Sequence, residues 1–459
     1  MARFELLEPF LEDGILNTNF FNGRLLSAED LRTEQQAALK RASHLGAAAG
    51  AGVVRGLRVS KVPPASPGGA LTGAAVKVSK GLGVNAAGQT LWLPSEAEVK
   101  LVRERDAAPP EAGLFTACPP PRTQTVAAGA GVYVLAVRPA SGFAGQAPLS
   151  GLGGAGLSSP GCGSRYSVGG VQFKLADLAI ADNASIDGAA RARIIALMSA
   201  GDAASLSRLR NELAHACFGT ARFASLVADP YAQDDDPFAE ADDPQTAADE
   251  RERPAPAYGA LTHLYQSCAL DSCDLPLALV YWSKNGIEFV DEWSVRRRLT
   301  RGAAFERWSP LADDRRAAEG GAAFEQFQDQ IGTFSASAHL VKAREHFRYL
   351  PAAGVIPAAK EGTEQGAFSR EVFFEGLTYR PPIYMDGARL AALLRLSLTF
   401  SPLDVTSGEV IWLSWVVQNA RAADADKAVR RYLVFSKGHM PPEDNARFDL
   451  ARWDYSNYV

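Results

Sequence analysis

The chain has 459 residues, of which 47% are hydrophobic and 22% are charged, and its formal net charge is −5. This length is enough for about two to four domains with substantial cores, which excludes a small disulfide-stapled scaffold. The weak negative charge argues against nucleic acid and anionic membranes as general partners. The N-terminus lacks the apolar core of a signal peptide and no run approaches about 18 uncharged apolar residues, so we expect cytoplasmic synthesis and no integral membrane segment.

The first predicted element is a helix that begins near Ala28. Ser27 is suited to the N-cap position, while Glu29 and Asp30 place negative charge at the positive end of the helix dipole. Apolar residues then recur at roughly helical spacing, at Leu31, Ala38, Ala42, Leu45 and Ala49. Because most of them are alanine, this face buries little area, and the helix needs a large partner from its own chain or from another.

After this N-terminal docking segment and helix, assigned to residues 1–52, the hydrophobic period falls to about two. We therefore predict a β-rich domain over residues 53–228 with a hairpin at 76–94 and a strand at 132–137 that is apolar on both faces. Glycine and serine dominate residues 141–170, which predicts a long surface loop. Two short helices are expected as an insertion, at residues 189–198 and 203–218.

Residues 229–256 are acidic and contain several prolines, which predicts a solvated linker. Residues 257–337 then hold a hairpin and a helical connector. In the hairpin an apolar strand leads to Asn285 and Gly286, which favour a type I′ turn. Residues 338–459 alternate helix and strand patterns, which predicts a C-terminal α+β domain. The predicted class is thus multi-domain α+β, with β-rich domains that resemble sandwiches or barrels and carry inserted helices.

Two clusters of side chains invite a functional reading. The basic run of Arg296, Arg297 and Arg298 lacks interleaved aromatic residues, so we favour a salt-bridged surface at a subunit interface over a nucleic-acid patch. Cys268 and Cys273 form at most half of a zinc site, and we expect both to be buried free thiols. The wide spacing and odd number of the five cysteines argue against a disulfide framework and fit a reducing compartment.

The usual catalytic motifs are missing, which predicts a protein that is not an enzyme and uses no cofactor and no metal. Two alternatives stay open. A receptor- or glycan-binding module would use exposed aromatic residues such as Trp412, Trp415 or Trp453. A cell-wall hydrolase would need a pair of carboxylates at a defined separation, for which the available pairs are Glu371 with Glu375 and Asp291 with Glu292.

Three N-terminal motifs carry a resemblance to a known family. They are Phe-Phe-Asn-Gly-Arg-Leu-Leu at residues 20–26, Ala-Glu-Asp-Leu-Arg-Thr-Glu-Gln at 28–35 and Gly-Val-Val-Arg-Gly-Leu-Arg-Val at 52–59. Similar stretches occur at residues 273–279, 293–298, 347–351 and 447–450. This pattern resembles baseplate-associated accessory proteins of phage-tail-like contractile injection systems, although residues 47–49 are all alanine where that family is more polar.

The resemblance implies a structural component of such a particle, peripheral to the baseplate as a shell, cage or fibre attachment, or an adaptor at a tube end. Its partners would be other baseplate and tail proteins and further copies of itself, in a particle that is assembled in the cytoplasm and then released or active at a membrane. From the concentration of apolar side chains over a narrow helix, we place the assembly interface at Phe20, Phe21, Leu25, Leu26 and Leu31. Arg24 and Arg32 are expected to orient this contact.

Overall fold

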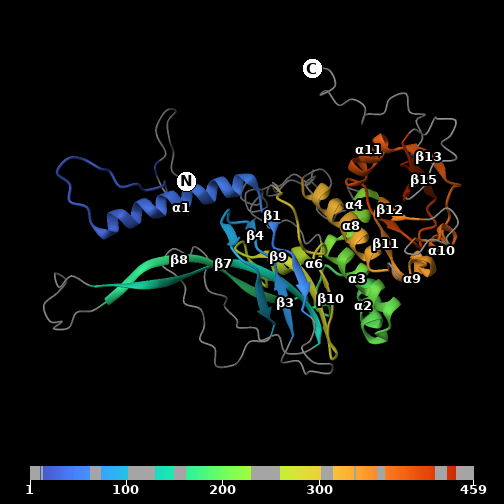
Figure 1. Cartoon of the computed structure of the whole chain (residues 1–459), viewed down its shortest axis with the longest axis horizontal. Helices are drawn as coiled ribbons and strands as arrows, with labels where there is room; N and C mark the ends of the chain where they lie inside the picture. Colours follow the sequence, from blue (N-terminus) through green and yellow to red (C-terminus); the bar gives the residue numbers. More distant parts are fainter. Residues whose placement is uncertain are drawn as a thin grey trace, which may run out of the picture.

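The computed structural model describes residue 11 and residues 14–62, 74–101, 130–148, 162–228, 259–300, 314–334, 337–358, 367–418 and 432–440. The predicted α+β class is confirmed, because an N-terminal helix is followed by several mainly antiparallel sheets with helices packed beside them (Figure 1). The sheets built from these residues are open and do not close into a barrel. The predicted acidic linker and the aromatic C-terminal stretch lie outside the described residues.

The first helix, α1 (Ala28–Ala49), has the predicted start. Ser27 caps it, since the Asp30 backbone N–H donates to the Ser27 hydroxyl (3.1 Å) and the Ser27 backbone N–H donates to the Asp30 carboxylate (2.9 Å). This reciprocal capping box satisfies two backbone donors that the helix itself leaves open. The helix ends at Gly50, whose positive φ of 98° is accessible to glycine.

Two small antiparallel sheets follow α1. One has the order β1-β4-β5, and the other has the order β2-β3-β6. The predicted hairpin at residues 76–94 is present as β4 and β5, joined by a turn in which the Asn85 side chain accepts from the Gln89 backbone N–H (2.8 Å). The strands are β1 (Gly52–Gly56), β2 (Val59–Lys61), β3 (Ala75–Val78), β4 (Gly81–Val84), β5 (Thr90–Leu93) and β6 (Ala97–Lys100).

A four-stranded antiparallel sheet forms the centre of the molecule, in the order β10-β9-β7-β8. Its strands are β7 (Gly131–Pro148), β8 (Cys162–Asp177), β9 (Leu275–Ser283) and β10 (Gly286–Asp291). The hairpin of β9 and β10 was predicted, and it completes a sheet begun more than a hundred residues earlier in the chain.

The two faces of β7 explain why its sequence is apolar throughout. Tyr133, Leu135 and Val137 pack toward the two small sheets, as in a sandwich, whereas alternate residues pack toward helices. These helices are α2 (Gly188–Ala200), α3 (Ala203–Phe218) and α6 (Ala260–Gln266), with α4 (Thr220–Ala228) after α3. The prediction that this strand lies inside a layered structure is confirmed, and so are the two inserted helices.

The C-terminal part is built on a second four-stranded sheet in the order β12-β16-β15-β13, in which only β13 and β15 run parallel. Phenylalanines dominate the core beneath it, including Phe327, Phe347, Phe373 and Phe435. The main elements are α8 (Asp314–Gly332), β12 (Ala353–Pro357), β13 (Ile383–Asp386), α11 (Gly387–Ser397), β15 (Ile411–Val417) and β16 (Tyr432–Lys437). Shorter elements are η2 (Ala338–Leu340), α9 (Ala343–His346), β11 (Tyr349–Leu350), α10 (Arg370–Phe373) and β14 (Leu403–Asp404).

Polar side chains on α3 connect the central sheet with the C-terminal part. Asn211 is fully buried, and its side chain accepts from the backbone N–H groups of Arg348 and Tyr349 and donates to the Tyr349 carbonyl (2.9, 3.0 and 3.0 Å). Arg210 donates to Asp291 of β10 (2.5 Å) and to Asp329 of α8. These bonds fix the orientation of the two parts as well as their contact.

The predicted loop at residues 141–170 is wrong at both ends. β7 continues to Pro148 and β8 begins at Cys162, so the described residues of this stretch form a ribbon of two paired strands. The low strand propensity of glycine and serine was overridden by a continuous backbone ladder, which needs no particular side chain.

The predicted type I′ turn between β9 and β10 is also wrong. Only Gly286 has a positive φ (111°) in the β9–β10 turn, and a type I′ turn would require one at Asn285 as well.

Candidate assembly surface

The N-terminal segment and α1 expose most of their large apolar side chains. Leu25 is 93% exposed, Phe21 62% and Phe20 57%. The remaining predicted docking residues, Leu26 and Leu31, are each more than half exposed. Of the 22 residues of α1, only Ala37 is buried. The structure therefore brings the predicted interface residues together on one arm and leaves them open to solvent.

Arg24 is used inside this arm. Its guanidinium forms an ion pair with Asp30, donates to the Asn19 carbonyl (2.6 Å) and lies 5.8 Å from the centre of the Phe21 ring. Hydrogen bonds from Ser27 and the charge of Arg24 lower the pKa of Asp30. Arg24 thus links the segment to the first turn of α1, and the Phe21 ring beside it stays exposed. Arg32, by contrast, lies exposed on the helix.

The segment before Arg24 folds back along α1. The Thr18 hydroxyl donates to the Asp30 carbonyl (2.7 Å), and Arg41 donates to the Asn17 side chain (2.5 Å). The segment therefore runs along the side of α1 that carries Ala37, the one buried residue of the helix. Leu31, Leu39 and Leu45 of α1 stay exposed.

Near its C-terminal end, α1 contacts the β4–β5 turn at a pair of glycines, Gly46 on the helix and Gly88 on the turn. A Cβ on Gly46 would lie 2.0 Å from the Gly88 carbonyl oxygen, and a Cβ on Gly88 would lie 1.8 Å from the Ser43 carbonyl oxygen. Only residues without side chains permit this approach between the helix and the β4–β5 turn. The helix therefore leaves the body at a fixed point and projects away from it, as Figure 1 shows.

A second projection is the outer part of the β7–β8 ribbon, which extends toward the same side as α1 in the view of Figure 1. β9 pairs with β7 only as far as Val137, so beyond that residue β7 pairs with β8 alone. Phe143, Tyr166 and Val168 are about half exposed here. An isolated two-stranded ribbon is marginally stable in water, and its open edges invite pairing.

Sequence reasoning missed this ribbon. The available signal was the alternation of Tyr166 and Val168 with Arg165 and Ser167, which has the period of a strand. It was outweighed by the surrounding glycines.

The arginine run is not a surface cluster, and that prediction is wrong. Arg296 is buried and donates to the carbonyls of Gly56 and Leu57, the latter at 2.8 Å. Arg297 donates to the carbonyls of Trp293, Ser294 and Arg296 and lies 5.0 Å from the Phe218 ring centre. Arg296 therefore joins the segment after β10 to the end of β1, while Arg297 braces that segment and packs against α3. Of the three arginines only Arg298 is exposed.

Two of the carboxylates considered for hydrolysis are buried in structural contacts. Asp291 accepts from Arg210 and from the Ser294 backbone N–H (2.8 Å), while Glu292 forms an ion pair with Arg58 (2.6 Å) and accepts from the Val59 backbone N–H. Burial raises the pKa of Glu292 although the hydrogen bond from Val59 and the charge of Arg58 oppose this shift.

The other two carboxylates are exposed, and each forms an ion pair with a basic side chain. Glu371 pairs with Arg370, and Glu375 pairs with Lys342 (3.1 Å). Within the described residues, no group of three or more His, Cys, Asp or Glu side chains is arranged to hold a metal ion.

The aromatic residues considered for glycan binding are not an open platform. Trp415 is buried, and Trp412 is partly buried, with its indole N–H donating to the Gly438 carbonyl (2.9 Å). Trp453 lies outside the described residues. The cysteine predictions also need correction. Cys268 is exposed, and Cys273 is disulfide-bonded, although the number and spacing of the cysteines argued against disulfides.

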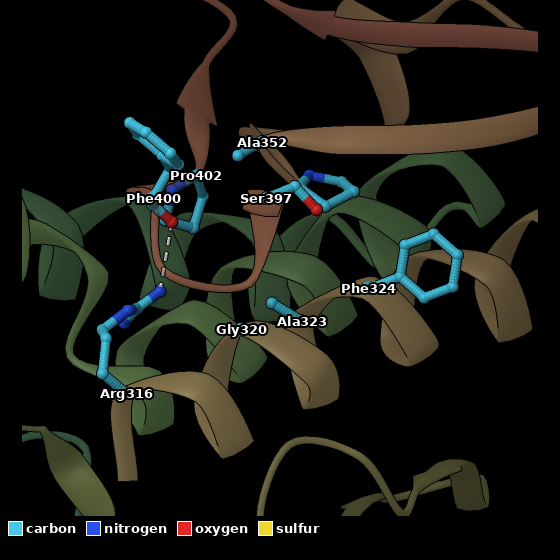
Figure 2. Close-up of a pocket in the computed structure, with 9 residues that line it drawn as sticks. Arg316, Gly320, Ala323, Phe324, Ala352, Ser397, Phe400 and Pro402 are labelled. Atoms are coloured by element: carbon cyan, nitrogen blue, oxygen red, sulfur yellow. Dashed lines mark hydrogen bonds between the residues drawn. The ribbon is translucent and has the colours of Figure 1, made fainter. Parts of the chain in front are cut away.

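A small recess lies between α8 and the residues around the end of α11 (Figure 2). Gly320, Ala323 and Phe324 form one wall, and Arg316 donates to the Phe400 carbonyl at its edge (3.3 Å). Its interior has room for about one water molecule. That size suits a packing gap and is too small for a substrate.

None of the described helices is both long and apolar enough to cross a membrane.

Among the described residues, the exposed arm formed by residues 14–49 and the outer β7–β8 ribbon are therefore best suited to contact another macromolecule. Comparison with known proteins adds no assignment, since no family model, no curated protein and no solved structure matches the chain.

Proposed function

We propose that the protein is a structural component of a phage-tail-like contractile injection particle, held in place by its N-terminal arm. It lies at the periphery of the baseplate, as a shell, cage or fibre attachment, or acts as an adaptor at a tube end. It is synthesised and assembled in the cytoplasm, and it works through repeated protein–protein contacts without catalysing a reaction. The particle type comes from the motifs at residues 20–35 and 52–59.

The observation that carries the proposal is the exposure of Phe20, Phe21 and Leu25 on an arm that the other described residues do not cover. Burying three such side chains stabilises a contact by roughly 1.5–3 kcal/mol each. The arm is also ordered before binding, because Arg24, Asp30 and Ser27 link it to the first turn of α1, so little conformational freedom is lost on docking. Many weak copies in one particle then add through high effective concentration.

The test is incorporation of the full chain into particles, together with co-elution from a sizing column with purified baseplate and tail proteins. The double variant Phe20→Ser and Phe21→Ser is expected to lose co-elution and to lower incorporation at least tenfold. The matched control is the double variant Trp92→Ser and Tyr432→Ser, which removes two aromatic residues that are equally exposed on β5 and β16. Normal incorporation of the Phe20 and Phe21 variant would refute the docking role of the arm.

A further inference from the structure

The exposed face of α1 has the spacing of a coiled-coil seam. Steps of three and four residues alternate along Ala28, Leu31, Gln35, Ala38, Ala42 and Leu45, and every one of these residues is exposed. This alternation is the a/d pattern with which one helix packs against another helix. In the part of the chain that the structure describes, no helix lies on this face, and the N-terminal segment follows the helix beside the buried Ala37.

We propose that the occupant of this seam is α1 of a second copy of the chain, packed antiparallel. The inference rests on the proposed assembly function, because it names the partner for one face of the docking arm. It also commits to a register, in which Gln35 of one copy lies opposite Ala38 of the other.

Side-chain size supports the antiparallel register. It places Leu31 opposite Ala42 of the second copy and Leu45 opposite Ala28 of the second copy. Every layer then pairs one long side chain with one alanine, so the helices approach closely without leaving voids. A parallel pair would instead stack Leu31 on Leu31 and Ala42 on Ala42, which alternates crowded layers with empty ones.

Charge supports the same arrangement. Glu34 and Arg41 occupy the g positions that flank the seam, and g positions face each other across an antiparallel pair. Within its own chain Arg41 donates to the side chain of Asn17, which is a neutral group. In the proposed register Glu34 lies opposite Arg41 of the second copy, and the two-fold axis repeats this pair. A parallel pair would place Glu34 near Leu39 and Arg41 near Gly46, where neither charge has a partner. The helix dipoles are also opposed only in the antiparallel pair.

The attachment of α1 leaves room for this partner. Gly46 fixes the C-terminal end of the helix at the Gly88 turn, so about four turns before it stand clear of the body. In an antiparallel pair the two bodies lie at opposite ends of the seam and do not collide. The contact is self-complementary, as the two-fold symmetry of most homodimers requires.

The test is disulfide cross-linking of full-length chains in a Cys268→Ser background, because Cys268 is an exposed free thiol. Chains carrying Leu31→Cys are mixed with chains carrying Ala42→Cys under mild oxidation. We expect dimers that contain one chain of each kind and almost none from Ala42→Cys alone, since the two Ala42 positions lie roughly 16 Å apart along the antiparallel seam. Lys40→Cys, on the outer face of α1, is the matched control and is expected to give no dimer.

Charge exchange gives an independent readout by light scattering. Glu34→Arg or Arg41→Glu alone is expected to weaken self-association about tenfold, because each places like charges opposite each other twice. An equal mixture of the two single variants restores attraction at both pairs and is expected to associate again. Retained secondary structure by circular dichroism shows that each variant is folded. Arg41 is exposed and Glu34 is half-buried.

The outcomes separate this inference from the proposed function. Cross-linking of Ala42→Cys to itself, or no cross-link in any mixture at high protein concentration, overturns the antiparallel pair even when co-elution with baseplate proteins is intact. If the chain without the Phe20 and Phe21 changes co-elutes with no baseplate or tail protein while Leu31→Cys and Ala42→Cys still cross-link specifically, the particle assignment is overturned and the helix pair stands.

Discussion

Gly46 of α1 and Gly88 of the β4–β5 turn meet backbone to backbone. A Cβ added to Gly88 would lie 1.8 Å from the Ser43 carbonyl oxygen, a separation that no real contact permits. Gly88 also has a φ of +76°, which a residue with a side chain adopts only with strain. One point of contact thus determines where the docking arm leaves the body.

Gly88→Ala is expected to detach α1 from the body while the sheets stay folded. The clash acts on Ser43, whereas the backbone strain alone costs about 1–2 kcal/mol. The measurement is limited proteolysis within residues 28–49, which should become at least tenfold faster. The matched control is Gly201→Ala, which has a similar φ of +67° at the end of α2 but nothing within 4 Å of the added methyl group. Equal proteolysis of the two variants would show that the contact does not hold the arm.

Arg210→Met is expected to destabilise the chain by about 3–5 kcal/mol. The change leaves Asp291 buried without the guanidinium that now donates to it at 2.5 Å, and an uncompensated buried carboxylate is costly. Urea denaturation followed by tryptophan fluorescence measures the difference. Lys342→Met, which removes an exposed ion pair with Glu375, should leave stability almost unchanged because water screens such pairs. A loss as small for Arg210→Met would mean that the network adds nothing.

The free energy of unfolding is expected to decrease as the pH decreases, because of His215. Burial, together with the nearby charge of Arg316, lowers the pKa of His215 from 6.5 to about 3. Since the folded pKa lies below the unfolded one, the unfolded chain binds the proton first. The stabilisation is complete above the unfolded pKa and is lost at about 1.4 kcal/mol per pH unit as the pH falls toward the folded pKa.

The check is urea denaturation at about pH 7 and about pH 5, where this residue alone should account for about 2 kcal/mol. His215→Gln removes the titrating group and should flatten that part of the pH dependence. Carboxylates elsewhere titrate in both proteins, so only the difference between wild type and variant is diagnostic. Identical pH dependences would contradict the buried neutral imidazole, whose ring nitrogen Nδ1 lies 2.8 Å from the Thr220 hydroxyl.

Backbone amides of the outer β7–β8 ribbon should exchange with solvent much faster than those of the inner part of β7. From Gly131 to Val137, β7 is paired on both sides, whereas residues 138–148 pair only with β8. Hydrogen exchange followed by mass spectrometry resolves the two regions, and slow exchange throughout would contradict the prediction. In assembled particles we expect the ribbon to become protected, because its open edges and exposed Tyr166 would then be covered.

Local signals predicted the elements whose determinants lie close together in sequence. Ser27 and Asp30 marked the start of α1 because capping depends on neighbours three residues apart. The alternation and turn residues of β9 and β10 likewise predicted a hairpin, although the type I′ turn at Asn285 and Gly286 was wrong. The apolar run of β7 indicated a strand covered on both faces, and the structure supplies sheets on one side and helices on the other.

Features that depend on distant partners were not predictable. From the sequence alone, Arg296 is expected to be a surface cation. In the structure it is buried because it donates to the carbonyls of Gly56 and Leu57, which are about 240 residues away in the chain. The ribbon beyond Val137 is a strand because β8 pairs with it, not because of its own composition. Within the candidate surface, the concentration of Phe20, Phe21 and Leu25 was visible in the sequence. The exposure of these three side chains was not visible, because a chain of this length could have buried them against another of its own elements.

The position of β9 in the sheet has a consequence for synthesis on the ribosome. β7 lies between β8 and β9, and β9 is translated more than a hundred residues after β7. At about 5–20 residues per second, one edge of β7 waits roughly 6–30 s for its neighbour. During that delay the nascent chain presents an apolar strand edge that can pair with another chain. Premature termination before Leu275 would therefore yield an aggregating fragment, and only complete chains would be available for assembly.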